Sequence, residues 1–196
     1  MKSPSKYDLA VTRIKAHNAQ IFRETTAIIQ NGYYFAPSGA RVDLHMQPML
    51  VGQRCYHKEL LPVQKPQVAG GTQILVQKGD CLAKAEELVQ QGYHPAVLNF
   101  ASAGHPGGGV QMGARAQEET ICRRSTLTRS IFSMDAKYAS QYGYPLFDGN
   151  HYPLTKSLDF SMIYTPEVTV FREADQDYTL MEQPFNVAVI TNAALN

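Results

Sequence analysis

A short apolar segment, a glycine-rich loop and a glycine-free segment follow one another near the middle of this chain. Ala96–Ala101 is mostly apolar and is bounded by Pro95 and by a Gly/Pro cluster, which is typical of a short buried strand. From Ala114 to Thr128 there is no Gly or Pro, and five residues recur at helical spacing: Ala114, Gln117, Ile121, Ser125 and Thr128. The sequence therefore predicts a strand–loop–helix unit with the glycines in the loop.

The three consecutive glycines of this loop, Gly107, Gly108 and Gly109, predict a site for an anion. Glycine has no Cβ, so its backbone reaches positive φ and approaches a ligand closely. Successive N–H groups in such a loop, with the start of the next helix, form a concavity that favours phosphate. The spacing excludes two common phosphate loops. There is no Lys between His94 and Lys137 for a P-loop, and the glycines do not follow G-x-G-x-x-G.

Two adjacent carboxylates, Glu118 and Glu119, come directly after Gln117 at the expected start of the helix. Neighbouring residues on a helix point about 100° apart, so these two do not form a pair on one face. We expect one carboxylate to face a ligand and the other to orient it or to face solvent. A simpler alternative is that both complement the helix dipole, which would contribute only about 0.3–1 kcal/mol each.

The composite pattern resembles the microbial-type poly(ADP-ribose) glycohydrolases, whose signature is a triple Gly followed at this distance by Gln-Glu-Glu. The segments that carry the resemblance here are Leu98–Ala103, Pro106–Gly109 and Gly113–Glu119. Flanking segments agree with the family as well, and they spread the similarity over most of the chain: Arg23–Thr26, Gly32–Tyr34, Ala36–Gly39, Cys122–Leu127, Ile163–Arg172 and Val187–Thr191.

The resemblance implies a macrodomain-like, three-layer α/β/α fold with a mixed sheet, formed by residues 1–196 as a single domain. It implies binding of ADP-ribose, or of poly(ADP-ribose) on modified proteins. It also implies hydrolysis of the O-glycosidic ribose–ribose bond of the polymer, which releases ADP-ribose and uses no cofactor.

The resemblance also assigns roles residue by residue. Glu119 matches the catalytic acid, and Glu118 matches the partner that hydrogen-bonds the terminal ribose. The substrate-binding positions that it implies lie at the strand end, in the loop and at the helix start: Asn99, Gly107, Gly108, Gly109, Val110 and Gln117.

One feature departs from the family pattern. The family continues well past the strand that ends near Thr191, whereas this chain stops at Asn196. A strand in such a sheet is usually followed by a covering helix, and none follows Phe185–Thr191. We therefore expect a domain that is incomplete at its C-terminus. Two alternatives to an active enzyme stay open: a non-catalytic ADP-ribose-binding module, which does not need Glu119, and an inactive truncated fragment.

The net charge, the apolar segments and the cysteines restrict which partners and which compartment we expect. The net charge is +1, so no direct nucleic-acid binding is expected. No apolar run reaches about 18 residues, and the N-terminus has no apolar signal segment, so no membrane association is expected. The three scattered cysteines are typical of a reducing compartment, which predicts a cytoplasmic protein. His94 and His105 lack a carboxylate at ligand spacing, so we expect no metal site.

Strands and helices alternate along the rest of the chain, which indicates the α/β class. The expected elements are a helix at 7–30 ended by Gly32, a hairpin of 33–35 and 40–44, a strand at 73–76, a helix at 81–91 with Asp80 as N-cap, and strands at 163–171 and 185–191.

Overall fold

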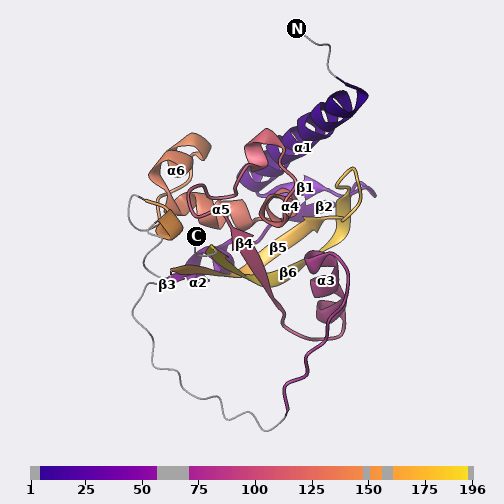
Figure 1. The fold of residues 1–196 in the computed structure, drawn as a ribbon. Coiled ribbons are helices and arrows are strands. Elements are labelled where there is room, and N and C mark those ends of the chain that lie inside the picture. The colour runs from indigo at the N-terminus through magenta and orange to yellow at the C-terminus, as the bar shows by residue number, and fades with distance from the viewer. Residues whose placement is uncertain (1–4, 57–70, 148–150, 156–160, 194–196) are drawn as a thin grey trace.

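A computed structural model describes residues 5–56, 71–147, 151–155 and 161–193 (Figure 1). Its centre is a four-stranded sheet in the order β3-β5-β6-β4. Strand β4 runs parallel to β6, while β5 is antiparallel to both β6 and β3, so the sheet is mixed. The predicted α/β class with a mixed sheet is thereby confirmed. The strand bounds are β3 Arg54–Tyr56, β4 Ala96–Ala101, β5 Met162–Arg172 and β6 Leu180–Ala193.

Helices α1, α4, α5 and α6 gather on one side of this sheet (Figure 1). The helices span α1 Lys6–Asn31, α2 Gln47–Gly52, α3 Cys81–Gln90, α4 Gln117–Arg124, α5 Leu127–Ile131 and α6 Ala136–Tyr142, and short 3-10 turns cover Val110–Met112, Phe132–Met134 and Pro153–Thr155. Of the helices described, none has the length and apolar character needed to cross a bilayer.

Burial alternates along the strands because successive side chains point to opposite faces of the sheet. Val97, Ile163 and Val189 share the face against which the helices pack, and they join one hydrophobic core. On the other face of β4, Leu98 and Phe100 remain 43% and 67% exposed. Burial of apolar area therefore stabilises β4 through only one of its two faces. Asn99 lies on that buried face.

Local end signals of two helices are confirmed. Gly32 has φ 78° and donates its N–H to the Ile28 carbonyl at 2.9 Å, so it ends α1 as predicted. The Asp80 carboxylate accepts the N–H groups of Leu82 and Ala83 at 3.1 and 2.9 Å, which makes it the N-cap of α3. The predicted hairpin is also present, as β1 Tyr33–Phe35 paired with β2 Arg41–Asp43.

The strand predicted at 73–76 is wrong. These residues carry no regular structure, and Ile74, Leu75 and Val76 are 86%, 78% and 95% exposed. Their β-branched and apolar character favours an extended chain, but a strand also needs a neighbour to take its backbone hydrogen bonds. No described strand pairs with this segment.

The single helix predicted from Ala114 to Thr128 is also wrong, because the structure divides it into α4 and α5. Ser125 is extended, with φ −144° and ψ 173°, and forms a β-bridge with Val170 of β5. The Thr126 N–H donates to the Thr169 carbonyl at 2.9 Å. These tertiary hydrogen bonds replace the helical ones and attach the end of α4 to the centre of the sheet.

Candidate active site

Gln117, the first residue of α4, bonds the free edge of β4. Its side-chain oxygen accepts the Phe100 N–H at 3.0 Å, and its side-chain nitrogen donates to the Leu98 carbonyl at 2.9 Å. The amide thus takes the place of a neighbouring strand over this stretch. Both ends of the amide are used by the backbone, so Gln117 aligns the helix start with the strand end.

Glu118 joins the two ends of the loop that follows β4. One carboxylate oxygen accepts the Ser102 N–H at 2.7 Å, and the other accepts the Gly107 N–H at 3.0 Å. The residue is only 3% exposed. A buried carboxylate with two backbone donors holds the loop in one shape.

Glu119 binds the backbone of the same loop two residues after the point that Glu118 binds. Its Oε1 accepts the Gly109 N–H at 2.8 Å, whereas its Oε2 is buried and has no hydrogen-bond partner among the described residues. Of the two alternatives for the second glutamate, the one in which it faces solvent is wrong, since Glu119 is only 7% exposed and Glu118 is more buried still. Glu119 Oε2 is therefore the one oxygen of this pair of carboxylates without a hydrogen-bond partner among the described residues.

The glycines allow this close approach of the carboxylates. Gly107 and Gly108 have φ of 76° and 56°, in the left-handed region that glycine adopts readily. A Cβ on Gly108 would lie 2.5 Å from Glu119 Oε1 and 3.0 Å from Glu118 Oε2. The triplet is therefore required by the two glutamates that pack against it, whatever else the loop binds.

All three glycine N–H groups have partners inside the protein. Gly107 and Gly109 donate to the glutamates, and Gly108 donates to the His105 carbonyl at 2.9 Å. This arrangement differs from the expected one, in which these amides stand free to hold a diphosphate. In the structure they hold the carboxylates of α4.

Burial governs the charge state of Glu118. The pKa of this carboxyl is raised to about 7. Burial is the largest cause, the neighbouring Glu119 adds to it, and the Ser102 and Gly107 N–H groups act in the opposite direction. Protonation of this carboxyl therefore changes near neutral pH.

Asn99 lies two residues before the end of β4 and is fully buried. Its side-chain nitrogen donates to Thr191 Oγ1 at 3.3 Å, on the neighbouring strand β6, and its side-chain oxygen has no partner among the described residues. Val110 is also fully buried, and its N–H donates to the Gly107 carbonyl at 3.1 Å. The Asn99 side-chain oxygen is thus a polar atom without a hydrogen bond within the described residues. The buried Val110 side chain holds the loop against the core.

The structure adds two supports that the sequence did not indicate. A Cβ on Gly107 would lie 3.1 Å from the Phe132 ring, so this ring forms the floor under the loop. A Cβ on Gly113, which has φ 75°, would lie 1.9 Å from the Lys15 carbonyl oxygen. Helix α1 therefore sits directly on the far end of the loop. Phe132 is far from Gly107 in the sequence, so no local pattern indicates that they are in contact. An isolated glycine such as Gly113, in contrast, is a signal for close backbone contact.

Across the described part of the chain, no group of three or more His, Cys, Asp or Glu side chains is arranged to hold a metal ion. The site that the structure does assemble consists of three consecutive side chains of α4 attached to successive points of one strand and loop.

Known proteins share this arrangement of elements. Residues 22–173 match the family described as microbial-type PARG, catalytic domain, where PARG is poly(ADP-ribose) glycohydrolase. The PARG of Thermomonospora curvata bound to the inhibitor ADP-HPD is 35% identical, with a TM-score of 0.71 over 91% of this chain and 63% of that chain. The PARG of Deinococcus radiodurans in complex with ADP-ribose is 30% identical, with a TM-score of 0.59 over 79% of this chain and 60% of that chain.

A further structure of the Thermomonospora curvata enzyme gives 34% identity and a TM-score of 0.72 over 91% of this chain and 64% of that chain. This chain therefore spans less than two thirds of the length of these relatives. Among curated proteins, no sequence matches it. The family match covers more than half of the chain and includes the whole strand–loop–helix site, so this chain belongs to the family of microbial-type poly(ADP-ribose) glycohydrolase catalytic domains.

Proposed function

We propose that this chain hydrolyses the O-glycosidic ribose–ribose bond of poly(ADP-ribose) and that Glu119 is its general acid. One observation carries the proposal. Glu119 has one oxygen fixed on Gly109 and a second, buried oxygen without a partner in the described part of the chain. A carboxyl group held by one oxygen, with its other oxygen free of hydrogen bonds within the protein, suits delivery of a proton to a bound substrate.

The chemistry requires a proton donor at the leaving oxygen. The bond between C1″ of one ribose and the oxygen of the next breaks, and that oxygen takes the proton from Glu119 as it departs with the bonding electrons. The sugar passes through an oxocarbenium-like transition state, which the carboxylate left behind stabilises. Water then adds to C1″ and returns a proton to Glu119.

We infer a second role for Glu118, which hydrogen-bonds a ribose hydroxyl when the ligand is present and holds the loop through Ser102 and Gly107. Asn99 supplies a further polar contact from the strand end. The loop formed by Gly107, Gly108, Gly109 and Val110 surrounds the diphosphate, and Gln117 acts on binding by fixing the helix start. The ADP-ribose complex of the Deinococcus radiodurans relative supports this choice of ligand.

We propose that residues 1–196 act as one domain on ADP-ribose polymers carried by modified proteins, without a cofactor. We place this activity in the cytoplasm, because Cys81 and Cys122 are thiols that form no disulfide.

Two assays on the purified chain test the proposal. The first measures release of ADP-ribose from a polymer-modified protein, and the second measures binding of ADP-ribose by calorimetry. We expect both release and binding. Binding without release would contradict the enzymatic role and indicate a non-catalytic binding module. The absence of both would indicate an inactive fragment.

A further inference from the structure

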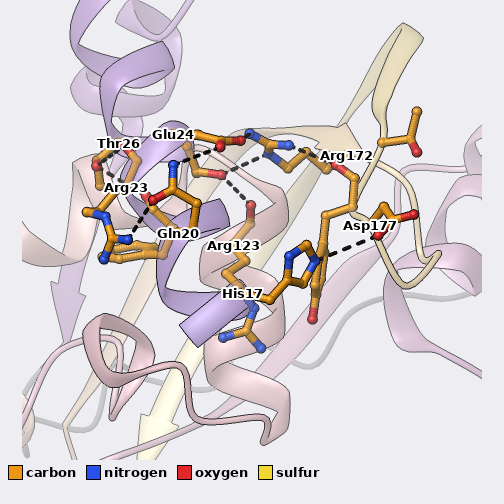
Figure 2. A network of polar contacts seen from close by, with 12 residues as sticks. His17, Gln20, Arg23, Glu24, Thr26, Arg123, Arg172 and Asp177 are labelled. Atoms are coloured by element: carbon orange, nitrogen blue, oxygen red, sulfur yellow. Dashed lines mark hydrogen bonds and ion pairs between the residues drawn. The ribbon is translucent and has the colours of Figure 1, made fainter. Parts of the chain in front are cut away.

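A cavity of about 590 Å³ has a lining that includes none of the glycine-loop residues. Three parts of the chain form it: the N-terminal half of α1, Arg115 just before α4, and the turn between β5 and β6. Figure 2 shows this region, with His17 of α1 directed toward Asp177 of the turn. Nothing in the proposed hydrolysis uses this cavity.

The ring of Tyr178 forms an aromatic wall of the cavity. The guanidinium of the fully buried Arg123 lies 5.3 Å from the ring centroid. Arg123 is itself fixed, because its Nη1 donates to the Ala114 carbonyl at 2.6 Å. A cation behind an aromatic ring holds the ring in place.

The backbone at Tyr178 supports the same conclusion. Its φ of 52° is unfavourable for a bulky side chain. The conformation is held by the surrounding turn, since Arg172 Nη1 donates to the Tyr178 carbonyl at 2.8 Å and Asp175 accepts the Thr179 N–H at 3.0 Å. Strain of this kind persists where the surroundings determine the position of a side chain, and here it directs a tyrosine ring to the cavity.

Two arginines of the cavity offer guanidinium donors to an anion. Arg13 and Arg115 both line it, both are exposed, and neither has an ion-pair partner among the described side chains. Two acidic side chains of the turn, Asp175 and Asp177, also line the cavity, and each lies beside a polar neighbour. Asp175 accepts hydrogen bonds from Thr179, and Asp177 lies 3.9 Å from His17 Nε2. Two guanidinium groups therefore remain available, and their geometry suits phosphate oxygens.

An aromatic face beside unpaired guanidinium groups matches the chemistry of a nucleotide, whose base stacks and whose phosphate pairs with arginine. The cavity is also close to the candidate active site. Asn18, which lines it, donates to the Gly113 carbonyl at 3.3 Å, and Gly113 lies between the glycine loop and Arg115. The Asn18–Gly113 hydrogen bond thus connects the wall of the cavity to the segment between the glycine loop and α4.

We propose that this cavity is an accessory subsite that binds an adenine nucleotide unit of an ADP-ribose polymer while another unit occupies the candidate active site. The role in polymer binding rests on the proposed function, whereas nucleotide binding by the cavity does not. The subsite would increase the affinity for polymer over that for single ADP-ribose, because two linked units bind together.

The test uses Arg13→Glu, with Lys15→Glu as a matched control. Both positions are exposed on α1, and both changes reverse one charge, but Lys15 does not line the cavity. Calorimetry with AMP measures the cavity, and fluorescence anisotropy with end-labelled polymer measures the longer ligand. We expect Arg13→Glu to weaken AMP binding at the cavity and polymer binding by roughly tenfold, with ADP-ribose binding at the candidate active site unchanged. Lys15→Glu is expected to leave all three unchanged.

The outcomes separate the two proposals. Equal effects of Arg13→Glu and Lys15→Glu would contradict the subsite and indicate a general charge effect, and no effect of Arg13→Glu on AMP would contradict it as well. Loss of AMP binding without any change for polymer would limit the cavity to free nucleotides and overturn its role as a polymer subsite. If neither the parent chain nor the variants release ADP-ribose, but Arg13→Glu still loses AMP binding, the proposed hydrolysis is contradicted and nucleotide binding by the cavity is supported.

A Tyr178→Leu variant tests the aromatic wall of the cavity separately. We expect it to lose AMP affinity as well.

Discussion

A Cβ on Gly108 would lie 2.5 Å from Glu119 Oε1, closer than two such atoms can approach. The backbone of Gly108 and the carboxylate of Glu119 therefore occupy adjoining space that only a glycine leaves open. We expect Gly108→Ala to displace the Glu119 carboxylate and to reduce polymer turnover. The clash should also lower the free energy of unfolding by about 1–3 kcal/mol, measured by urea denaturation.

Gly143→Ala is the matched control for this substitution. Gly143 also has a positive φ, 67°, but no atom would lie within 4 Å of its Cβ. Both variants share the strain of a left-handed alanine, about 1–2 kcal/mol, so their difference isolates the contact with the glutamates. Equal losses of stability and of turnover in the two variants would show that the contact of Gly108 with the glutamates contributes to neither.

The raised pKa of Glu118 predicts a pH dependence of stability. Burial, opposed by two N–H donors, raises the pKa of this carboxyl from 4.5 to about 7 in the folded state. The folded state then binds this proton more tightly than the unfolded state does. The contribution to stability is fully present below pH 4.5 and is lost as the pH rises toward 7.

Glu118→Gln removes this titration. The quantity to compare is the free energy of unfolding of the parent chain minus that of the Glu118→Gln variant. We expect this difference to fall by up to about 3 kcal/mol between pH 4.5 and pH 7. Urea denaturation at a series of pH values measures the difference. A difference that stays constant, or that rises with pH, is incompatible with a raised pKa at Glu118.

The amide of Gln117 gives a prediction about the edge of β4. Gln117→Glu keeps an acceptor for the Phe100 N–H but loses the donor to the Leu98 carbonyl. We expect a loss of about 1–2 kcal/mol in the free energy of unfolding. Gln47→Glu is the control, because Gln47 is likewise the first residue of a helix but is exposed. A loss at Gln117 no larger than at Gln47 would rule out the pairing with the strand edge.

Local chemistry made part of this fold predictable. The N-cap at Asp80, the end of α1 at Gly32 and the strand before the glycines each depend on a few neighbouring residues. These features appear in the structure where the sequence indicated them. The alternation of strands and helices indicated the α/β class, and the family resemblance added the mixed sheet.

The errors arise where distant residues decide the structure. Ser125 leaves the helical path because Val170, far along the chain, forms a bridge with it. The segment containing Ile74 and Val76 has strand propensity but no strand beside it. Glycine spacing predicted an anion site, but it could not show that the nearest anions are the carboxylates of the following helix.

The central claim is that Glu119 supplies the proton while the loop binds the substrate, and one substitution tests it most directly. Glu119→Gln keeps an oxygen that can accept the Gly109 N–H, but it removes the acid. The account predicts that release of ADP-ribose from the polymer falls by at least about 100-fold, with ADP-ribose affinity unchanged in calorimetry. A variant that releases ADP-ribose at nearly the parent rate would contradict the account.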